Sequence, residues 1–94
     1  MADEMIRFFG RATGRVQGVG FRFFVQQNAL EIGLTGWVRN MEDGAVTMEI
    51  QGTQPQVDAF AQRVRKGNYF IKVKEFAMEP KKLQENEKSF TIAY

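Results

Sequence analysis

The sequence predicts an α+β fold in which two helices cover one face of an antiparallel sheet of four to five strands. Three observations carry this prediction: the order of the strand-like and helix-like segments, the glycines that separate them, and a length of 94 residues, which suits one compact core. The order is strand, helix, strand, strand, helix, strand, with one more strand at the C-terminus. This order is typical of a split βαβ arrangement, the ferredoxin-like sandwich. We expect residues 1–94 to form a single domain.

The first predicted strand and the first predicted helix flank a glycine-rich loop. Residues 5–13 alternate in hydropathy, which predicts a strand with one wetter face. Apolar side chains then recur at helical spacing from Phe21 to Ile32, and Gly33 is placed as a C-terminal stop. These apolar positions predict the buried face of an amphipathic helix.

The middle of the chain predicts a β-hairpin. Two strand-like runs, residues 35–41 and 45–51, are separated by a Glu-Asp-Gly turn in which Gly44 can adopt a positive φ. The second run alternates cleanly between apolar and polar side chains. This alternation is expected for a sheet that is covered on one face only.

The last third of the chain predicts a second helix and two further strands. Thr53 and Gln56 fit a capping box at the start of the helix, and Gly67 is placed to end it. Strands are predicted over residues 69–78 and 89–94. The polar stretch between them is expected to be a loop.

The composition excludes several kinds of catalytic site. The chain has no Cys, which excludes disulfides and thiolate metal sites and is compatible with a reducing compartment. It has no His, which excludes a Ser-His-Asp triad and the usual catalytic zinc sites. No secretory signal or membrane-spanning stretch is apparent. We therefore expect a cytoplasmic protein with no metal and no membrane partner.

The charge balance argues against nucleic acid as the main partner. Thirteen Lys and Arg stand against eleven Asp and Glu, and the formal net charge is +2. Positive and negative residues are interleaved along the chain rather than gathered into one basic run.

The candidate functional stretch is the loop at residues 14–22, which reads GRVQGVGFR. Its glycines, Gly14, Gly18 and Gly20, allow backbone conformations that turn several N–H groups toward one point, and the following helix adds the positive end of its dipole. Arg22 supplies a fixed charge with planar, bidentate donors that suit phosphate oxygens. A tight connection is the alternative. The loop is neither a dinucleotide-binding fingerprint nor a Walker loop, because it lacks a third spaced glycine and a Lys-Ser/Thr pair.

This loop, together with residues 36–46 (GWVRNMEDGAV) and Gly52, resembles the two signature segments of the acylphosphatases. The similarity extends over essentially the whole chain. The resemblance implies the ferredoxin-like fold and an enzyme that hydrolyses the carboxyl-phosphate bond of a small acyl phosphate to a carboxylate and inorganic phosphate. It also implies a monomer that needs no cofactor and is inhibited by its product, inorganic phosphate.

The resemblance assigns roles to individual residues. Asn40 would orient the attacking water, and Arg22 would bind the phosphoryl oxygens. The backbone N–H groups that complete the phosphate site would come from six loop residues: Val16, Gln17, Gly18, Val19, Gly20 and Phe21. For Asn40 a turn-forming role is the alternative, because Asn before a Glu-Asp-Gly turn is a common turn residue.

Two other functions stay open from the sequence. A non-catalytic module could bind phosphate through the same loop. An RNA-binding module of the same fold could use Phe9 and Trp37 to stack bases, although residues 46–50 lack the aromatics of the RNA-recognition signature.

Overall fold

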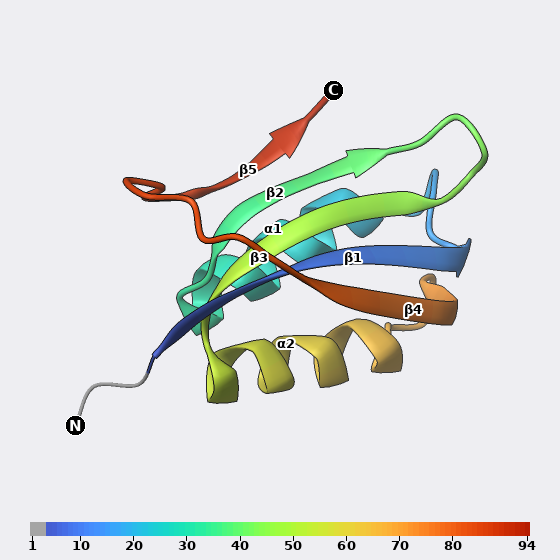
Figure 1. Ribbon diagram of the computed structural model, residues 1–94. Helices are drawn as coiled ribbons and strands as arrows, with labels where there is room; N and C mark the ends of the chain where they lie inside the picture. The colour runs from blue at the N-terminus through green and yellow to red at the C-terminus, as the bar shows by residue number, and fades with distance from the viewer. Residues whose placement is uncertain (1–3) are drawn as a thin grey trace.

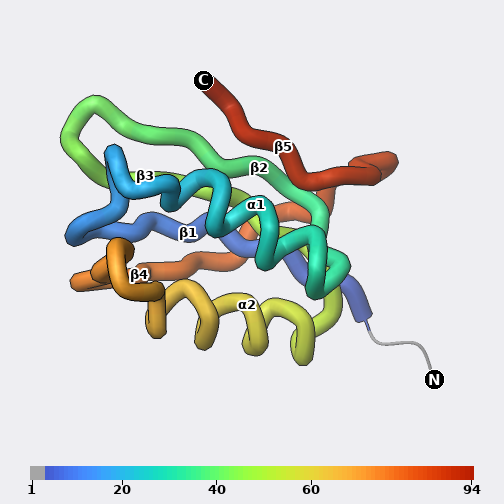
Figure 2. Tube along the Cα trace, turned by 180° about the vertical axis from the view of Figure 1, so that it is seen from behind, coloured from blue at the N-terminus to red at the C-terminus, as the bar shows by residue number. Residues whose placement is uncertain are grey.

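A computed structural model describes residues 4–94, and its elements follow the predicted order. The five strands form one sheet in the order β4-β1-β3-β2-β5, and both helices pack on the same face of it (Figures 1 and 2). The elements are β1 (Met5–Arg15), α1 (Phe21–Ile32), β2 (Thr35–Asn40), β3 (Val46–Thr53), α2 (Gln54–Lys66), β4 (Lys72–Lys81) and β5 (Phe90–Ala93). Across residues 4–94, α1 and α2 are both shorter than the roughly 20 residues that a bilayer span requires.

The sheet is mixed rather than purely antiparallel. β1 pairs antiparallel with β3 and β4, and β2 pairs antiparallel with β3. β5, however, runs parallel to β2, with Gly36 opposite Phe90. The expectation of an antiparallel sheet is therefore wrong at this edge. The reason is the connection over residues 82–89, which starts from the opposite edge of the sheet and crosses its open face before β5 begins (Figure 1).

The core lies between the helices and one face of the sheet. Alternate residues of β3 are fully buried there, as the hydropathy pattern predicted, and they pack with the apolar side of both helices. Burial of each large apolar side chain contributes roughly 1.5–3 kcal/mol. The largest of these side chains are Phe21, Phe60, Leu34, Met48 and Ile50.

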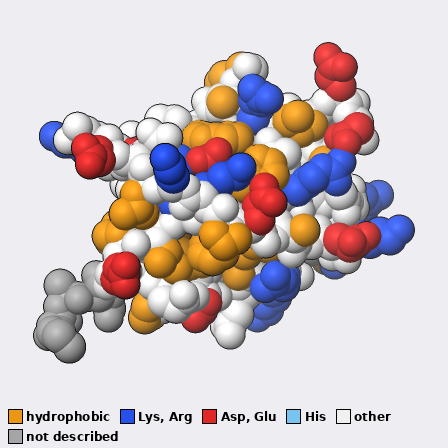
Figure 3. Space-filling model, in the orientation of Figure 1, with side chains coloured by type: hydrophobic (Ala, Val, Ile, Leu, Met, Phe, Trp, Pro, Cys, Tyr) orange, Lys and Arg blue, Asp and Glu red, His pale blue; other side chains and the backbone are white. Residues whose placement is uncertain are grey.

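The opposite face of the sheet is partly covered, contrary to the expectation of coverage on one face only. Arg7 of β1 is just 2% exposed, and its Nε and Nη1 atoms donate 2.7 Å hydrogen bonds to Glu49 and Glu87 respectively. Glu87 belongs to the crossing segment, residues 82–89. Gln51, also buried, donates to a carbonyl of the same segment. These polar contacts hold the segment across the sheet, on a face where acidic and basic side chains are mixed (Figure 3).

The two ends of α2 agree with the sequence prediction. The Thr53 side chain accepts a hydrogen bond from the Gln56 backbone N–H, and the Gln56 side chain accepts from the Thr53 N–H at 2.8 Å. The capping box is therefore confirmed, and Gly67 ends the helix with φ +62°.

The boundaries of β4 differ from the prediction. The strand begins at Lys72 rather than at residue 69, because the Asn68 side chain accepts hydrogen bonds from the N–H groups of Phe70 and Ile71 and closes a turn there. It continues through Pro80, which an edge strand tolerates because one side of its backbone needs no partner.

Candidate active site

The loop between β1 and α1 is built around two glycines in the left-handed region. Gly18 has φ +73° and Gly20 has φ +77°. A Cβ atom added to either glycine would meet no atom within 4 Å. Glycine is therefore required here by the backbone conformation and not by crowding. The open space beside both residues leaves the loop backbone accessible to a ligand.

Gly14 has a different role from the other two glycines. It lies within β1, at a shift of register relative to β4, and has φ +115°. A Cβ atom on Gly14 would lie 2.4 Å from the carbonyl oxygen of Lys72. Gly14 thus permits the close approach of β4 and does not belong to the anion-binding loop with which the sequence pattern grouped it.

The loop presents unpaired backbone donors. The N–H groups of residues 17–20 form no hydrogen bond with any acceptor in residues 4–94. α1 follows at Phe21 without a side-chain cap from Gly20 and without an acidic residue in its first turn. Because the first N–H groups of a helix have no acceptor within the helix, these donors and the positive end of the helix dipole reinforce one another. Such an arrangement binds anions.

A cleft of about 320 Å³ brings the two signature segments together. Six of the eight site residues predicted from the sequence line this cleft, whereas Gln17 and Val19 do not. Val16 and Phe21 are each only 1% exposed, so their side chains do not face a ligand in the cleft. The lining residues are Val16, Gly18, Gly20, Phe21, Arg22, Phe23, Asn40, Ile92 and Tyr94.

Arg22 lies in the first turn of α1 with most of its donors uncommitted. Its Nη1 atom donates to the carbonyl oxygen of Ala93 over 3.4 Å, and its Cζ atom lies 4.9 Å from the centre of the Tyr94 ring. Within the described part of the chain, Arg22 forms no ion pair with an acidic side chain. A guanidinium carries five N–H donors, so it can still bind an oxyanion through two of them.

Asn40 is the last residue of β2, and its side chain does not form the following turn. Its Oδ1 atom is buried and accepts no hydrogen bond from any residue between 4 and 94. The turn is instead closed by Asp43, whose carboxylate accepts from the Ala45 N–H at 3.0 Å, and by the 2.8 Å bond from the Met41 N–H to the Ala45 carbonyl. The turn-forming alternative for Asn40 therefore finds no support in its hydrogen bonding.

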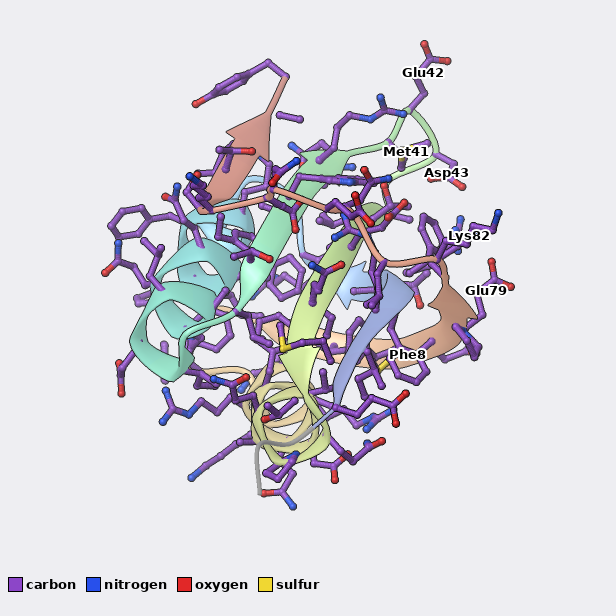
Figure 4. All side chains as sticks on the ribbon, turned by 60° about the vertical axis from the view of Figure 1, so that its left-hand side comes forward. Phe8, Met41, Glu42, Asp43, Glu79 and Lys82 are labelled. Atoms are coloured by element: carbon purple, nitrogen blue, oxygen red, sulfur yellow. The ribbon has the colours of Figure 1, made fainter. Side chains whose placement is uncertain are left out.

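Gln17 connects the loop to this turn. Its Nε2 atom donates two 2.8 Å hydrogen bonds, one to the carbonyl oxygen of Met41 and one to that of Ala45. Met41 lies where β2 enters the turn, and Glu42 beside it points away from the protein (Figure 4). The Gln17 side chain thus sets the position of the loop relative to the strand end that carries Asn40.

Three residues of the lining were not foreseen: Phe23, Ile92 and Tyr94. Ile92 and Tyr94 reach the cleft because β5 pairs with β2 next to Asn40, and no local pattern in the sequence reveals that pairing. No group of three or more His, Cys, Asp or Glu residues is arranged to hold a metal ion in the part of the chain that is described.

Comparison with known proteins identifies the family of the chain. The sequence model of the family described as Acylphosphatase matches residues 8–92. The chain belongs to the acylphosphatase family. Acylphosphatases are hydrolases, so the chain belongs to a family of enzymes, as the two signature segments predicted.

Individual acylphosphatases resemble the chain closely. The acylphosphatase of Geobacillus kaustophilus is 48% identical over 81 residues, which is 86% of each chain. That of Clostridium beijerinckii is 42% identical over 90 residues, which is 96% of this chain and 100% of the relative. The crystal structure of acylphosphatase from Bacillus subtilis superposes with a TM-score of 0.89 at 36% identity, over 95% of this chain and 99% of that one. The predicted ferredoxin-like fold of the acylphosphatases is confirmed.

Proposed function

We propose that this acylphosphatase hydrolyses small acyl phosphates by direct attack of water on a phosphoryl group bound in the cleft. The water oxygen forms a bond to phosphorus while the bond from phosphorus to the carboxylate oxygen breaks. The products are a carboxylate and inorganic phosphate. The observation that carries the proposal is the convergence of unpaired loop N–H groups, Arg22 and Asn40 on one cleft.

The phosphoryl group is bound by the loop and by Arg22. Its oxygens accept hydrogen bonds from the backbone N–H groups of residues 16–21 and a bidentate pair from the guanidinium. These donors are fixed by the glycine conformations and by the start of α1, so little reorganisation is needed when charge redistributes in a loose transition state.

Asn40 orients the attacking water. Its amide oxygen accepts a hydrogen bond from the water, and the unsatisfied Oδ1 atom supports this role because a buried polar atom without a partner costs about 1–3 kcal/mol. A carboxylate leaves readily, so no strong base is required. An oxygen of the substrate phosphoryl group accepts the proton of the water, which suits a chain that contains no histidine.

The same site needs no metal and is inhibited by inorganic phosphate. Guanidinium and backbone N–H groups have no lone pair to offer a cation, whereas Mg²⁺ is bound through oxygen ligands. Inorganic phosphate retains the oxygens that the loop recognises, so it competes with the substrate for the cleft.

Two observations favour turnover over the alternatives. A site that only binds phosphate needs hydrogen-bond donors. Asn40 adds an acceptor to the cleft, because its amide oxygen has no partner in residues 4–94. An RNA-binding module of this fold would use the open face of the sheet. Here the segment 82–89 crosses that face and is held by Arg7 and Gln51.

The test is hydrolysis of acetyl phosphate in the presence of a chelator and in water labelled with ¹⁸O. We expect phosphate release to continue with chelator and the label to appear in inorganic phosphate, because water attacks phosphorus. A divalent-metal requirement would contradict the metal-free site. Label in the acetate would contradict attack at phosphorus.

A further inference from the structure

Two neighbouring aromatic side chains protrude from the turn between α2 and β4. Tyr69 is 83% exposed and Phe70 is 62% exposed. Their ring centres are 5.1 Å apart and their planes are inclined by 80°, so they stand edge to face. Neither residue belongs to the core or to the cleft that holds Arg22. Apolar surface exposed in this way commonly marks an interaction site.

The turn holds the two rings in this position. The Asn68 Oδ1 atom accepts 2.9 Å hydrogen bonds from the N–H groups of Phe70 and Ile71, and the Asn68 N–H donates to the Ile71 carbonyl at 3.2 Å. Ile71 is 1% exposed and anchors the turn in the core. Gly67 permits the close approach, since a Cβ atom there would lie 2.4 Å from the Ile71 carbonyl oxygen. The rings are therefore fixed outward.

The charge around the turn is all of one sign along the chain. No Asp or Glu lies between Asp58 and Glu75, so this stretch carries only positive charges, whereas elsewhere positive and negative residues are interleaved. Arg63 is paired with Glu31, but three lysines of this stretch are exposed and form no ion pair in the part of the chain described: Lys66, Lys72 and Lys74. Arg15, which is also exposed, stands opposite Lys72 in the pairing of β1 with β4.

We propose that this surface docks the protein on an anionic lipid bilayer. Tyrosine is amphipathic and favours the membrane-water boundary, and phenylalanine inserts below it. Lysine extends its alkyl stem along the apolar boundary and keeps its charge at the level of the headgroups. The docking surface consists of Tyr69, Phe70, Lys66, Lys72, Lys74 and Arg15.

The geometry favours a bilayer over single-stranded nucleic acid. Proteins that bind single strands stack successive bases on aromatic faces along a basic groove. Tyr69 and Phe70 stand edge to face at the tip of a turn and so offer no pair of parallel faces. Peripheral docking needs no membrane-spanning segment, so the short lengths of α1 and α2 do not conflict with it.

Docking would bring the cleft close to the lipid surface. The turn and the phosphate loop lie at the same end of the sheet (Figures 1 and 2), and Arg15 ends β1 directly before that loop. Docking does not depend on hydrolysis, because lipid binding is measured without a substrate.

The experiment is sedimentation of the whole chain with phosphatidylcholine vesicles, with and without roughly one third phosphatidylserine. We expect binding only to the anionic vesicles, and release in 1 M salt, where the Debye length falls to about 3 Å. The double substitution Tyr69→Ser with Phe70→Ser should weaken binding at least about tenfold, since both anchors are lost. Leu30→Ser and Leu83→Ser, each removing a leucine that is 50% exposed elsewhere, should leave it unchanged.

The lysines give a second measurement. Lys72→Gln and Lys74→Gln should each weaken vesicle binding about fivefold, whereas Lys81→Gln and Lys82→Gln, outside the docking surface, should have little effect. Phe70→Trp keeps an aromatic ring and should be quenched by brominated lipid. Equal binding by wild type and the Tyr69/Phe70 double variant, or no vesicle binding by wild type, overturns the proposal. A single-stranded oligonucleotide bound through Tyr69 and Phe70 in place of vesicles would assign the surface to nucleic acid.

Discussion

The Gln17 side chain donates a 2.8 Å hydrogen bond to the carbonyl oxygen of Met41, and this bond joins the loop between β1 and α1 to the end of β2. A second 2.8 Å bond from the same nitrogen reaches the carbonyl of Ala45. One side chain therefore links the phosphate-binding and water-orienting halves of the proposed site.

Gln17→Leu should impair catalysis by loosening this link. The substitution keeps an apolar stem of similar size but removes both hydrogen bonds, which contribute about 1 kcal/mol each. We expect a fall in Tm of about 8–16 °C, at about 4–8 °C per kcal/mol for a chain of this size, and a clear loss of kcat/KM for acetyl phosphate. Gln62→Leu, on the exposed face of α2, is the control. Wild-type kinetics in Gln17→Leu would mean that the loop is aligned by other contacts.

Arg22→Lys should be nearly as damaging as Arg22→Ala. A point charge cannot reproduce two parallel donors to phosphoryl oxygens. Loss of one such preorganised contact typically costs about 2.7–4 kcal/mol, or roughly a hundred- to a thousandfold in kcat. Steady-state kinetics on both variants check this, with Arg39→Lys as the control for an exposed arginine that does not line the cleft. Near wild-type turnover in Arg22→Lys would reduce the role of Arg22 to general electrostatics.

Asn40→Ala should lower kcat severely while inhibition by inorganic phosphate stays close to wild type. The water-orienting role acts on the chemical step, not on phosphate affinity. Thermal stability should be unchanged or slightly higher, because the substitution removes a buried oxygen that has no partner among residues 4–94. Asn40→Asp should also be inactive, since it adds a negative charge beside the phosphoryl group. Variants that are active but unstable would contradict the assignment.

Gly18→Ala should weaken phosphate binding through the backbone. The left-handed conformation costs a residue with a Cβ atom roughly 1–2 kcal/mol, so the loop would relax and its N–H groups would move. We expect the inhibition constant for phosphate to rise about tenfold. Gly44→Ala is a matched control, because Gly44 also has a positive φ and open space but lies outside the cleft lining. An unchanged inhibition constant in a folded Gly18→Ala protein would exclude the loop from phosphate binding.

Because of Glu87, the free energy of unfolding should decrease at acid pH. Burial would raise the pKa of its carboxyl group, but the hydrogen bonds and charge of Arg7 outweigh burial, and the pKa lies below its usual range. A lowered pKa in the folded state means that the stabilisation is present at neutral pH and is lost as the pH falls from about 4.5 through that lower pKa.

Glu87→Gln tests this dependence. At pH 7 we expect it to lower the free energy of unfolding by about 1.5–3 kcal/mol, the usual contribution of hydrogen bonds between charged groups. The difference from wild type should shrink as the pH falls below 4. Denaturant unfolding at several pH values measures it, with Glu85→Gln, exposed in the same segment, as the control. A difference that does not change with pH would contradict the ion pair.

The sequence predicts well those features whose causes are local. The capping box of Thr53 and Gln56, the helix stops at Gly33 and Gly67, and the glycine-rich loop all follow from the conformational preferences of a few neighbouring residues. These features account for most of the fold and for the predicted location of the anion site.

Features that depend on long-range pairing were not predictable in this way. The residues around Arg7 in the sequence do not indicate that Glu87, 80 positions further along the chain, will cover its side chain. The parallel register of β5 likewise brings Tyr94 to Arg22 without any local pattern. The start of β4 was misplaced because the Asn68 side chain competes with the strand for the backbone N–H groups of the next residues.

The two outer strands of the sheet bear on how the protein behaves at high concentration. At one margin, β4 exposes Lys72, Lys74 and Lys81 and contains Pro80, which has no N–H to donate. At the other margin, β5 is only four residues long. The lysines of β4 repel an approaching chain by charge, and the short β5 offers it few free backbone groups. Cross-strand aggregation, the common failure of open sheets, is therefore discouraged at both sides of the molecule.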